Sequence, residues 1–313
     1  MPSVAPSQDF KEKVKAKAYK AVDRNGIIWV YMGPRKQPPP LPKIEATLLL
    51  ESEVDISFTQ RDCNWLQALE GDIDTSHFGF LHVGHLDPDN VPVGHPLEHT
   101  ASERAPEYHV SDAPWGTTYG AYRTVKPETT YWRFANYMFP FWTQTPQGEF
   151  PINIQARAWV PLDDEHVMMI FWRTKSTGGG TGQPLKDGKP LGGSRPQPEY
   201  LPISTEWLGR YRVKANESND WLIDREAQRT NRIYSGIDNI GLQDQAVTES
   251  MGAITNHEHE HLGPGDLMIS RTRRRVLKAA RAFQEGTAPI GVDQPEVLAE
   301  ARSGYFEAHE SVE

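Results

Sequence analysis

Two histidines and three acids lie close together in one short, mostly apolar stretch of the chain. The acids are Glu70, Asp72 and Asp74, and the histidines are His77 and His82. Residues 64–82 contain no Lys or Arg that could pair with these acids, unlike an ordinary surface helix. Imidazole nitrogens and carboxylate oxygens are typical ligands of divalent transition metals. The stretch is therefore a candidate metal site.

The spacing of the two histidines restricts the local structure. On a regular helix, at about 100° per residue, His77 and His82 would point about 140° apart, too far to share one metal. A helix over residues 64–81 must therefore loosen near the histidines, through a π-type turn or an early end. Asp74 lies three residues before His77 and shares its face, so Asp74 could orient that imidazole. The spacing alone also allows two ordinary core histidines without a metal.

Two separate motifs resemble one known family. The first is Asp74-x-x-His77-x-x-x-x-His82, preceded by Asn64-Trp-x-Gln-x-x-Glu70-Gly, and the second comprises residues 219–230 and 241–252. Together they resemble the mononuclear-iron signature of Rieske non-haem iron aromatic-ring-hydroxylating oxygenase large (alpha) subunits. The resemblance is to the phthalate dioxygenase and phenoxybenzoate dioxygenase branch. It extends over nearly the whole chain.

The resemblance implies a role for each site residue. His77, His82 and Asp244 would be the ligands of a mononuclear Fe(II), as two imidazoles and one carboxylate form the facial triad of non-haem iron oxygenases. Asp74 would bridge toward the cluster domain of a neighbouring subunit and carry electrons. Asn64 would lie near the iron without being a firm ligand.

The resemblance also implies an activity and partners. The chain would hydroxylate or dihydroxylate an aromatic, carboxylated substrate with O₂, using electrons from NADH through a reductase or ferredoxin, and the full-length protein would be a homotrimer. Two alternatives remain open at this point. One is a small-ligand or lipid-binding module without catalysis, because a fold does not determine function. The other is an inactive, truncated remnant.

The elements that would position these residues predict an α+β domain. Strand-like runs cover residues 46–51, 121–124, 130–139, 152–160 and 167–173, and helical patterns cover residues 64–81, 244–254 and 265–285. Residues 176–197 are rich in Gly, Lys and Pro and predict a surface loop. The pattern indicates an antiparallel sheet with long helices. The resemblance implies that this is a helix-grip (START/Bet v 1-like) fold.

A smaller unit precedes this domain. Residues 13–19 and 26–32 predict two strands of a hairpin around a turn at residues 23–26, and a Pro-rich connector follows at residues 37–42. By resemblance, residues 1–43 are the C-terminal remnant of a Rieske domain with its linker, and residues 44–313 are the catalytic domain. We expect Met1 to be an internal methionine of a longer gene.

A Rieske [2Fe–2S] cluster needs two Cys and two His. The chain has one cysteine, Cys63, and no histidine before His77. The cluster is therefore expected in the full-length protein, but this sequence does not ligate it. The cofactor expected on the residues present is the mononuclear iron.

Composition excludes other classes of protein. The net charge of −9 argues against a nucleic-acid-binding protein, and no apolar run reaches the roughly 20 residues of a membrane-spanning helix. The N-terminus has no signal peptide pattern, so we expect a cytoplasmic protein. Residues 271–275 with Lys278 and Arg281 form a basic helical face, which is either simply solvated or a docking surface for an acidic electron carrier.

Overall fold

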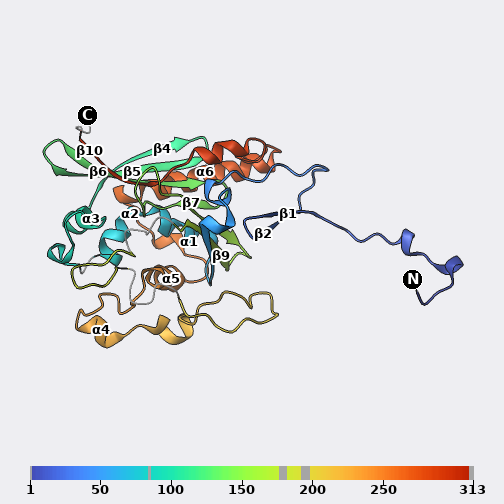
Figure 1. The fold of residues 1–313 in the computed structure, drawn as a ribbon, viewed down its shortest axis with the longest axis horizontal. Helices are drawn as coiled ribbons and strands as arrows, with labels where there is room; N and C mark the ends of the chain where they lie inside the picture. The colour runs from blue at the N-terminus through green and yellow to red at the C-terminus, as the bar shows by residue number, and fades with distance from the viewer. Residues whose placement is uncertain (1, 84–85, 176–181, 192–197, 310–313) are drawn as a thin grey trace.

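The computed structural model describes residues 2–83, 86–175, 182–191 and 198–309, and within them it shows an α+β fold. Its main feature is an eight-stranded sheet in which every strand pair is antiparallel, with the order β3-β9-β8-β7-β6-β5-β4 and β10 paired to β6 (Figure 1). The strands are β3 (Val54–Arg61), β4 (Glu107–Ala113), β5 (Gly116–Lys126), β6 (Thr129–Met138), β7 (Trp142–Gln144), β8 (Gln155–Pro161), β9 (Val167–Thr174) and β10 (Gly304–Ala308).

Helices lie around this sheet and carry the residues of the candidate site (Figure 1). They are α1 (Trp65–Ile73), α2 (Thr75–His77), the π-helix η5 (Phe78–His82), α3 (Glu98–Ser102), α4 (Arg225–Arg229), α5 (Ile240–Ser250) and α6 (Leu267–Gln284). Short 3₁₀ turns cover Pro6–Gln8, Lys11–Lys13, Glu45–Thr47, Glu51–Glu53, Pro88–Asn90, Glu217–Leu222, His257–His259, Pro264–Asp266 and Pro295–Glu300. The α+β fold expected from the sequence is confirmed.

The sheet is covered on both faces, because alternate residues of each strand point to opposite sides. On one side, Leu69 of α1 and Met268 of α6 pack with Trp159 of β8 in one buried cluster. On the other side, Trp142 and Trp172 form a second cluster. These two apolar layers keep the sheet rigid under the helices that hold the candidate site.

The N-terminal part is a hairpin of β1 (Lys20–Arg24) and β2 (Ile27–Tyr31). Asn25 and Gly26 both have positive φ, as a tight hairpin turn requires, so the predicted turn is confirmed. The strand predicted over residues 13–19 is wrong. Those residues precede β1 and are exposed in an extension that leaves the body of the molecule (Figure 1), because nothing beside them completes a sheet.

Other predicted elements agree with the structure to different degrees. The strand predicted at residues 46–51 is wrong: Ala46 and Thr47 are buried in a 3₁₀ turn, in which the Thr47 hydroxyl donates to the carbonyl of Ile44 at 2.8 Å. The runs at residues 121–124, 130–139, 152–160 and 167–173 correspond to β5, β6, β8 and β9, with ends shifted by up to five residues. Of the loop predicted at residues 176–197, residues 176–181 and 192–197 lie outside the described residues.

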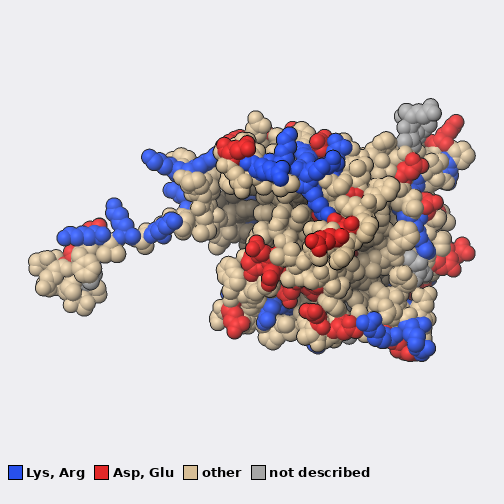
Figure 2. All heavy atoms as spheres, turned by 180° about the vertical axis from the view of Figure 1, so that it is seen from behind, with Lys and Arg blue, Asp and Glu red and all other residues tan. Residues whose placement is uncertain are grey.

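Charge is unevenly distributed over the surface. Figure 2 shows Lys and Arg side chains along the N-terminal extension and over the end of the molecule where α6 lies. There, Arg271, Arg274, Arg275 and Lys278 surround Asp112 in a shallow hollow of about 340 Å³. Within the described residues, no helix combines the length and the apolar composition needed to cross a membrane.

Candidate metal centre

The break after α1 brings the two histidines onto one side. Asp74 has an extended backbone (φ −92°, ψ 105°), so it ends α1, and its side chain accepts a hydrogen bond from the backbone N–H of Ser76 at 2.7 Å, so it also caps α2. Residues Phe78–His82 then form a π-helix. A π-helix has more residues in each turn than an α-helix, and it rotates His82 toward His77. The sequence predicted that the helix ends early or contains a π-type turn near the histidines, and the structure has both features.

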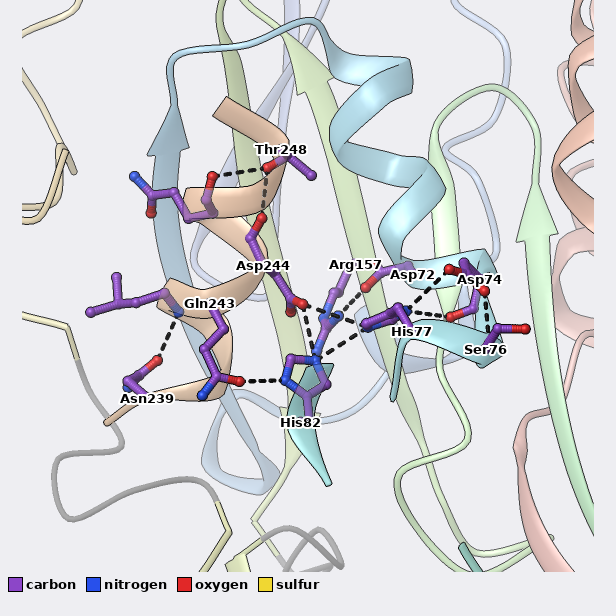
Figure 3. A network of polar contacts seen from close by, with 12 residues as sticks. Asp72, Asp74, Ser76, His77, His82, Arg157, Asn239, Gln243, Asp244 and Thr248 are labelled. Carbon is purple, nitrogen blue, oxygen red and sulfur yellow. Dashed lines mark hydrogen bonds and ion pairs between the residues drawn. The ribbon is translucent and has the colours of Figure 1, made fainter. Parts of the chain in front are cut away.

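Asp244 comes to the histidines from α5, more than 160 residues further along the chain. The side chain of Asn239 caps this helix by accepting from the backbone N–H of Leu242 at 2.9 Å. In Figure 3, Asp244 extends from α5 toward both imidazoles. Its Oδ1 lies 3.0 Å from Nε2 of His82 and 3.5 Å from Nε2 of His77.

The hydrogen bonds behind each imidazole determine its tautomer. Nδ1 of His77 lies 2.5 Å from the backbone carbonyl of Asp74, which can only accept, so this Nδ1 carries the hydrogen. Nδ1 of His82 lies 2.7 Å from Oε1 of Gln243, and the amide nitrogen of Gln243 donates to the carbonyl of Ile237 at 2.9 Å. In the neutral state, therefore, both Nε2 atoms present lone pairs toward Asp244.

These contacts place two lone pairs against each other. The Nε2 atoms of His77 and His82 are only 3.2 Å apart, and His82 is buried. Two bare imidazole nitrogens repel at this distance unless a proton or a metal ion lies between them. Burial alone would lower the pKa of His82, but the charge and hydrogen bond of Asp244 outweigh it and raise that pKa. Burial would likewise raise the pKa of Asp244, but His82 and His77 hold it well below its usual range.

The donor set fits a divalent metal. The three ligand atoms lie within 4.8 Å of one another. With bonds of about 2.1 Å, ligand atoms at right angles around one metal would be about 3.0 Å apart. The closest Nε2 and Oδ1 atoms of His77, His82 and Asp244 are separated by 3.0, 3.2 and 3.5 Å. Two imidazoles and one carboxylate on one face match the facial triad of non-haem iron sites, which leaves positions open for other ligands.

Asp74 and Asn64 have different places relative to this group. Asp74 holds His77 through its backbone carbonyl, and its carboxylate Oδ2 lies 3.7 Å from Nδ1 of the same imidazole. Asn64 instead caps the start of α1 by accepting from the backbone N–H of Leu66, while its amide donates to the carbonyl of Asp164. The nine residues of α1, about 13 Å of helix, lie between Asn64 and the break that precedes the histidines. The structure therefore does not bring Asn64 to the metal ligands, because its side chain is used as a helix cap.

Three further side chains support the site, of which only Asp72 was noted in the sequence, among the acids of the cluster. Gln243 orients His82, as described above. Asp72 accepts from the hydroxyl of Thr143 at 2.6 Å and from the indole N–H of Trp159 at 2.8 Å, and it forms an ion pair with Arg157. Figure 3 places Arg157 between Asp72 and Asp244. Gln243 could have been found from its position directly before Asp244 in the sequence. Its residue type, however, does not show which way the side chain points.

A pocket adjoins the candidate site. It has a volume of about 730 Å³, within the range of small-molecule sites. Its wall includes Leu242 and Gln245, which flank Asp244 along α5, and also Arg157. The pocket therefore reaches α5 beside Asp244, although His77, His82 and Asp244 themselves do not line it.

Comparisons with known proteins find one family model and several oxygenase subunits similar to this chain. Residues 30–308 match the family described as "LigXa C-terminal domain like". The chain is 50% identical to the 3-chlorobenzoate-3,4-dioxygenase oxygenase subunit of Comamonas testosteroni, an alignment that covers 100% of the chain and 73% of that protein. It is 29% identical to the phthalate 4,5-dioxygenase oxygenase subunit of Pseudomonas putida over 94% of the chain and 66% of that protein.

Among solved structures, one similar chain is dicamba monooxygenase bound to dicamba. The TM-score is 0.47 and the sequence identity is 13%, with 86% of this chain and 71% of that chain covered. The chain thus spans between about two thirds and three quarters of the length of the proteins named here.

Proposed function

The chain belongs to the Rieske-type oxygenase alpha subunits, through the LigXa C-terminal-like catalytic domain, and on that premise we propose that His77, His82 and Asp244 bind a mononuclear Fe(II) at which O₂ oxidises an aromatic acid. As an oxygenase subunit, the protein is an oxidoreductase. The observation that carries the proposal of a metal is the convergence of two bare Nε2 atoms and one carboxylate within 4.8 Å.

Ferrous iron, when bound, supplies the centre at which O₂ is activated. The residues of the chain orient the ligands, offset the metal charge and hold the substrate. Gln243 and the carbonyl of Asp74 hold the two imidazoles in the tautomer that turns Nε2 toward the iron. The carboxylate of Asp244 offsets part of the metal charge, and the adjoining pocket holds the aromatic substrate.

The reaction needs reducing equivalents. Hydroxylation consumes O₂, two electrons and two protons and releases water, whereas dihydroxylation consumes the same and keeps both oxygen atoms in the product. We propose that the electrons come from NADH through a reductase or ferredoxin. Asp74 would receive them from the cluster of a neighbouring subunit, because it contacts His77 on the side away from Asp244.

The domain division belongs to this proposal. Residues 1–43 would close a Rieske domain, and residues 44–313 would form the catalytic domain. The outward face of the hairpin supports this division, because Ile28, Val30 and Met32 expose between 50 and 72% of their surface, as residues that pack against a further layer would do. A [2Fe–2S] cluster in the full-length protein, a homotrimer and a cytoplasmic location stay predictions of the same proposal.

A single-turnover experiment tests the activity. The protein would be loaded with Fe(II) without oxygen, given dithionite as reductant and 3-chlorobenzoate as probe, and then mixed with ¹⁸O₂. We expect a product that contains ¹⁸O, in an amount not above the bound iron, and no product with Asp244→Asn. A product without ¹⁸O, or as much labelled product with Asp244→Asn as with the wild type, would contradict the proposed oxygenase activity at this site.

A further inference from the structure

One face of the sheet forms the floor of the pocket. Because directly paired residues of antiparallel strands point to the same side, Ser57 and Arg157 flank Phe171 there, while Thr59 and Trp159 flank Met169. The first turn of α5 and the segment at Tyr200 line the pocket as well. Phe171 and Met169 give the middle of this floor an apolar, ring-sized surface.

Arg61 lies at one end of this floor and makes no ion pair at contact distance, although its charge helps to lower the pKa of Asp244. It is only 5% exposed, and its guanidinium lies over the ring of Trp159, 4.8 Å from the ring centroid. Its Nε is buried without a hydrogen-bond partner, and Nη1 makes only a long contact of 3.4 Å to the hydroxyl of Thr248. No ion pair joins Arg61 to a carboxylate in the described part of the chain.

A buried guanidinium without an anion at contact distance is energetically unfavourable. Removing a charge from water costs several kcal/mol unless a partner of opposite charge replaces the hydration. An anion that pairs directly with Arg61 can enter through the pocket, because Arg61 is part of the pocket wall. Thr248 lies one turn after Asp244 in α5 and donates to its backbone carbonyl, so an anion held by Arg61 would lie close to the metal ligands.

The other two arginines of the pocket are already occupied or open to water. Arg157 forms an ion pair with Asp72, and its guanidinium stacks on Phe171, 4.7 Å from the ring centroid. Arg173 is 4.0 Å from Asp55 and its side chain is 45% exposed. Arg61 is therefore the arginine of this pocket that combines burial with the absence of a direct ion pair.

We propose that Arg61 binds the carboxylate of the aromatic substrate, while Met169 and Phe171 support the ring. This inference rests on the proposed function and assigns the residue that selects acids over uncharged aromatics. A carboxylate on Arg61 and a ring on Met169 and Phe171 would extend the substrate along one sheet face from β3 to β9.

Calorimetry on the full chain, metal-free and Fe(II)-loaded without oxygen, tests this role. The two probes are 3-chlorobenzoate and its uncharged amide, 3-chlorobenzamide. We expect the wild type to prefer the acid, and Arg61→Gln to bind the acid about 10- to 100-fold more weakly, the usual range for a lost charge-assisted hydrogen bond, with amide binding unchanged. Arg61→Lys should recover part of the acid affinity, since it keeps the charge, and Arg229→Gln on the exposed α4 serves as the matched control.

Several results would overturn the assignment. These are equal loss of acid and amide binding in Arg61→Gln, loss of the acid preference in Arg173→Gln instead, or a wild type that does not distinguish the two probes. If Arg61→Gln does not fold, the comparison of Arg61→Lys with wild type decides, because a bidentate site should lose acid affinity on this change. The metal-free arm separates the two hypotheses: acid selection without bound iron would support Arg61 even if the proposed iron site failed.

Discussion

Gln243 offers a sensitive test of how the site is organised. Its Oε1 accepts from Nδ1 of His82 at 2.7 Å, and it is buried, with 7% of its surface exposed. We predict that Gln243→Leu weakens Fe(II) binding, because leucine has a similar size but cannot hold the hydrogen of His82 on Nδ1. The imidazole would then place its hydrogen on Nε2 in part of the molecules, and that tautomer cannot bind the metal.

The magnitude follows from the lost hydrogen bond. Removing a group that orients a metal-binding histidine typically lowers metal affinity about 10- to 100-fold. This corresponds to about 1.4–2.8 kcal/mol of binding free energy. Stability should fall by a separate amount of about 1 kcal/mol, because the carbonyl of Ile237 also loses the donor that Gln243 provides.

The assay is an anaerobic Fe(II) titration against a competing chelator, at a temperature well below the unfolding transition of each variant. Gln243→Glu keeps an acceptor for Nδ1 and should retain most of the affinity. Gln228→Leu, on the exposed face of α4, is the matched control for the same substitution. An affinity of Gln243→Leu within about threefold of wild type would refute the argument that this hydrogen bond prepares His82 for the metal.

Three further predictions concern the rest of the chain. Asp72→Ala should lower the free energy of unfolding by about 3–5 kcal/mol, measured by urea titration, because it leaves Arg157 and the indole of Trp159 without their buried acceptor. The thiol of Cys63 should resist iodoacetamide at pH 8 in the folded protein and react on unfolding, because burial raises its pKa to about 11 and keeps it protonated. Deletion of residues 2–18 should change the free energy of unfolding by no more than about 0.5 kcal/mol, since this segment is mostly exposed; a larger change would reveal contacts that the structure lacks.

The residues brought together at the site differ in how far sequence could predict them. The spacing of His77 and His82 required a break or a π-type turn, and the structure has both, because the helical period cannot otherwise place both on one side. Asp244 came only from the resemblance, since no local pattern links α5 to α1. Asn64 near the iron also came only from the resemblance, whereas its position directly before a helix favours the capping role that the structure shows.

In the fold as well, elements with a clear pattern in their own residues were predicted, whereas elements that depend on residues far along the chain were not. The long strands β5, β6 and β9 and the helix α6 have strong patterns of their own, and these elements were predicted. The strand β10 was not, because residues 304–308 become a strand only by pairing with β6, about 170 residues away in sequence. The apolar run at residues 46–51 was misassigned because it has no neighbouring strand to pair with; it forms a 3₁₀ turn that buries Ala46 and Thr47, while Leu48 and Leu50 stay exposed.

Counting iron in the purified chain tests the central claim most directly. The chain would be loaded with Fe(II) without oxygen, freed of excess metal, and studied by EPR of its nitric oxide adduct, beside His77→Ala, His82→Ala, Asp244→Ala and the control His166→Ala. We predict one iron per chain with a high-spin adduct in wild type and in the control, and loss of both in each ligand variant. No specific iron, or iron binding that is indifferent to those three residues, would contradict the assignment of this site.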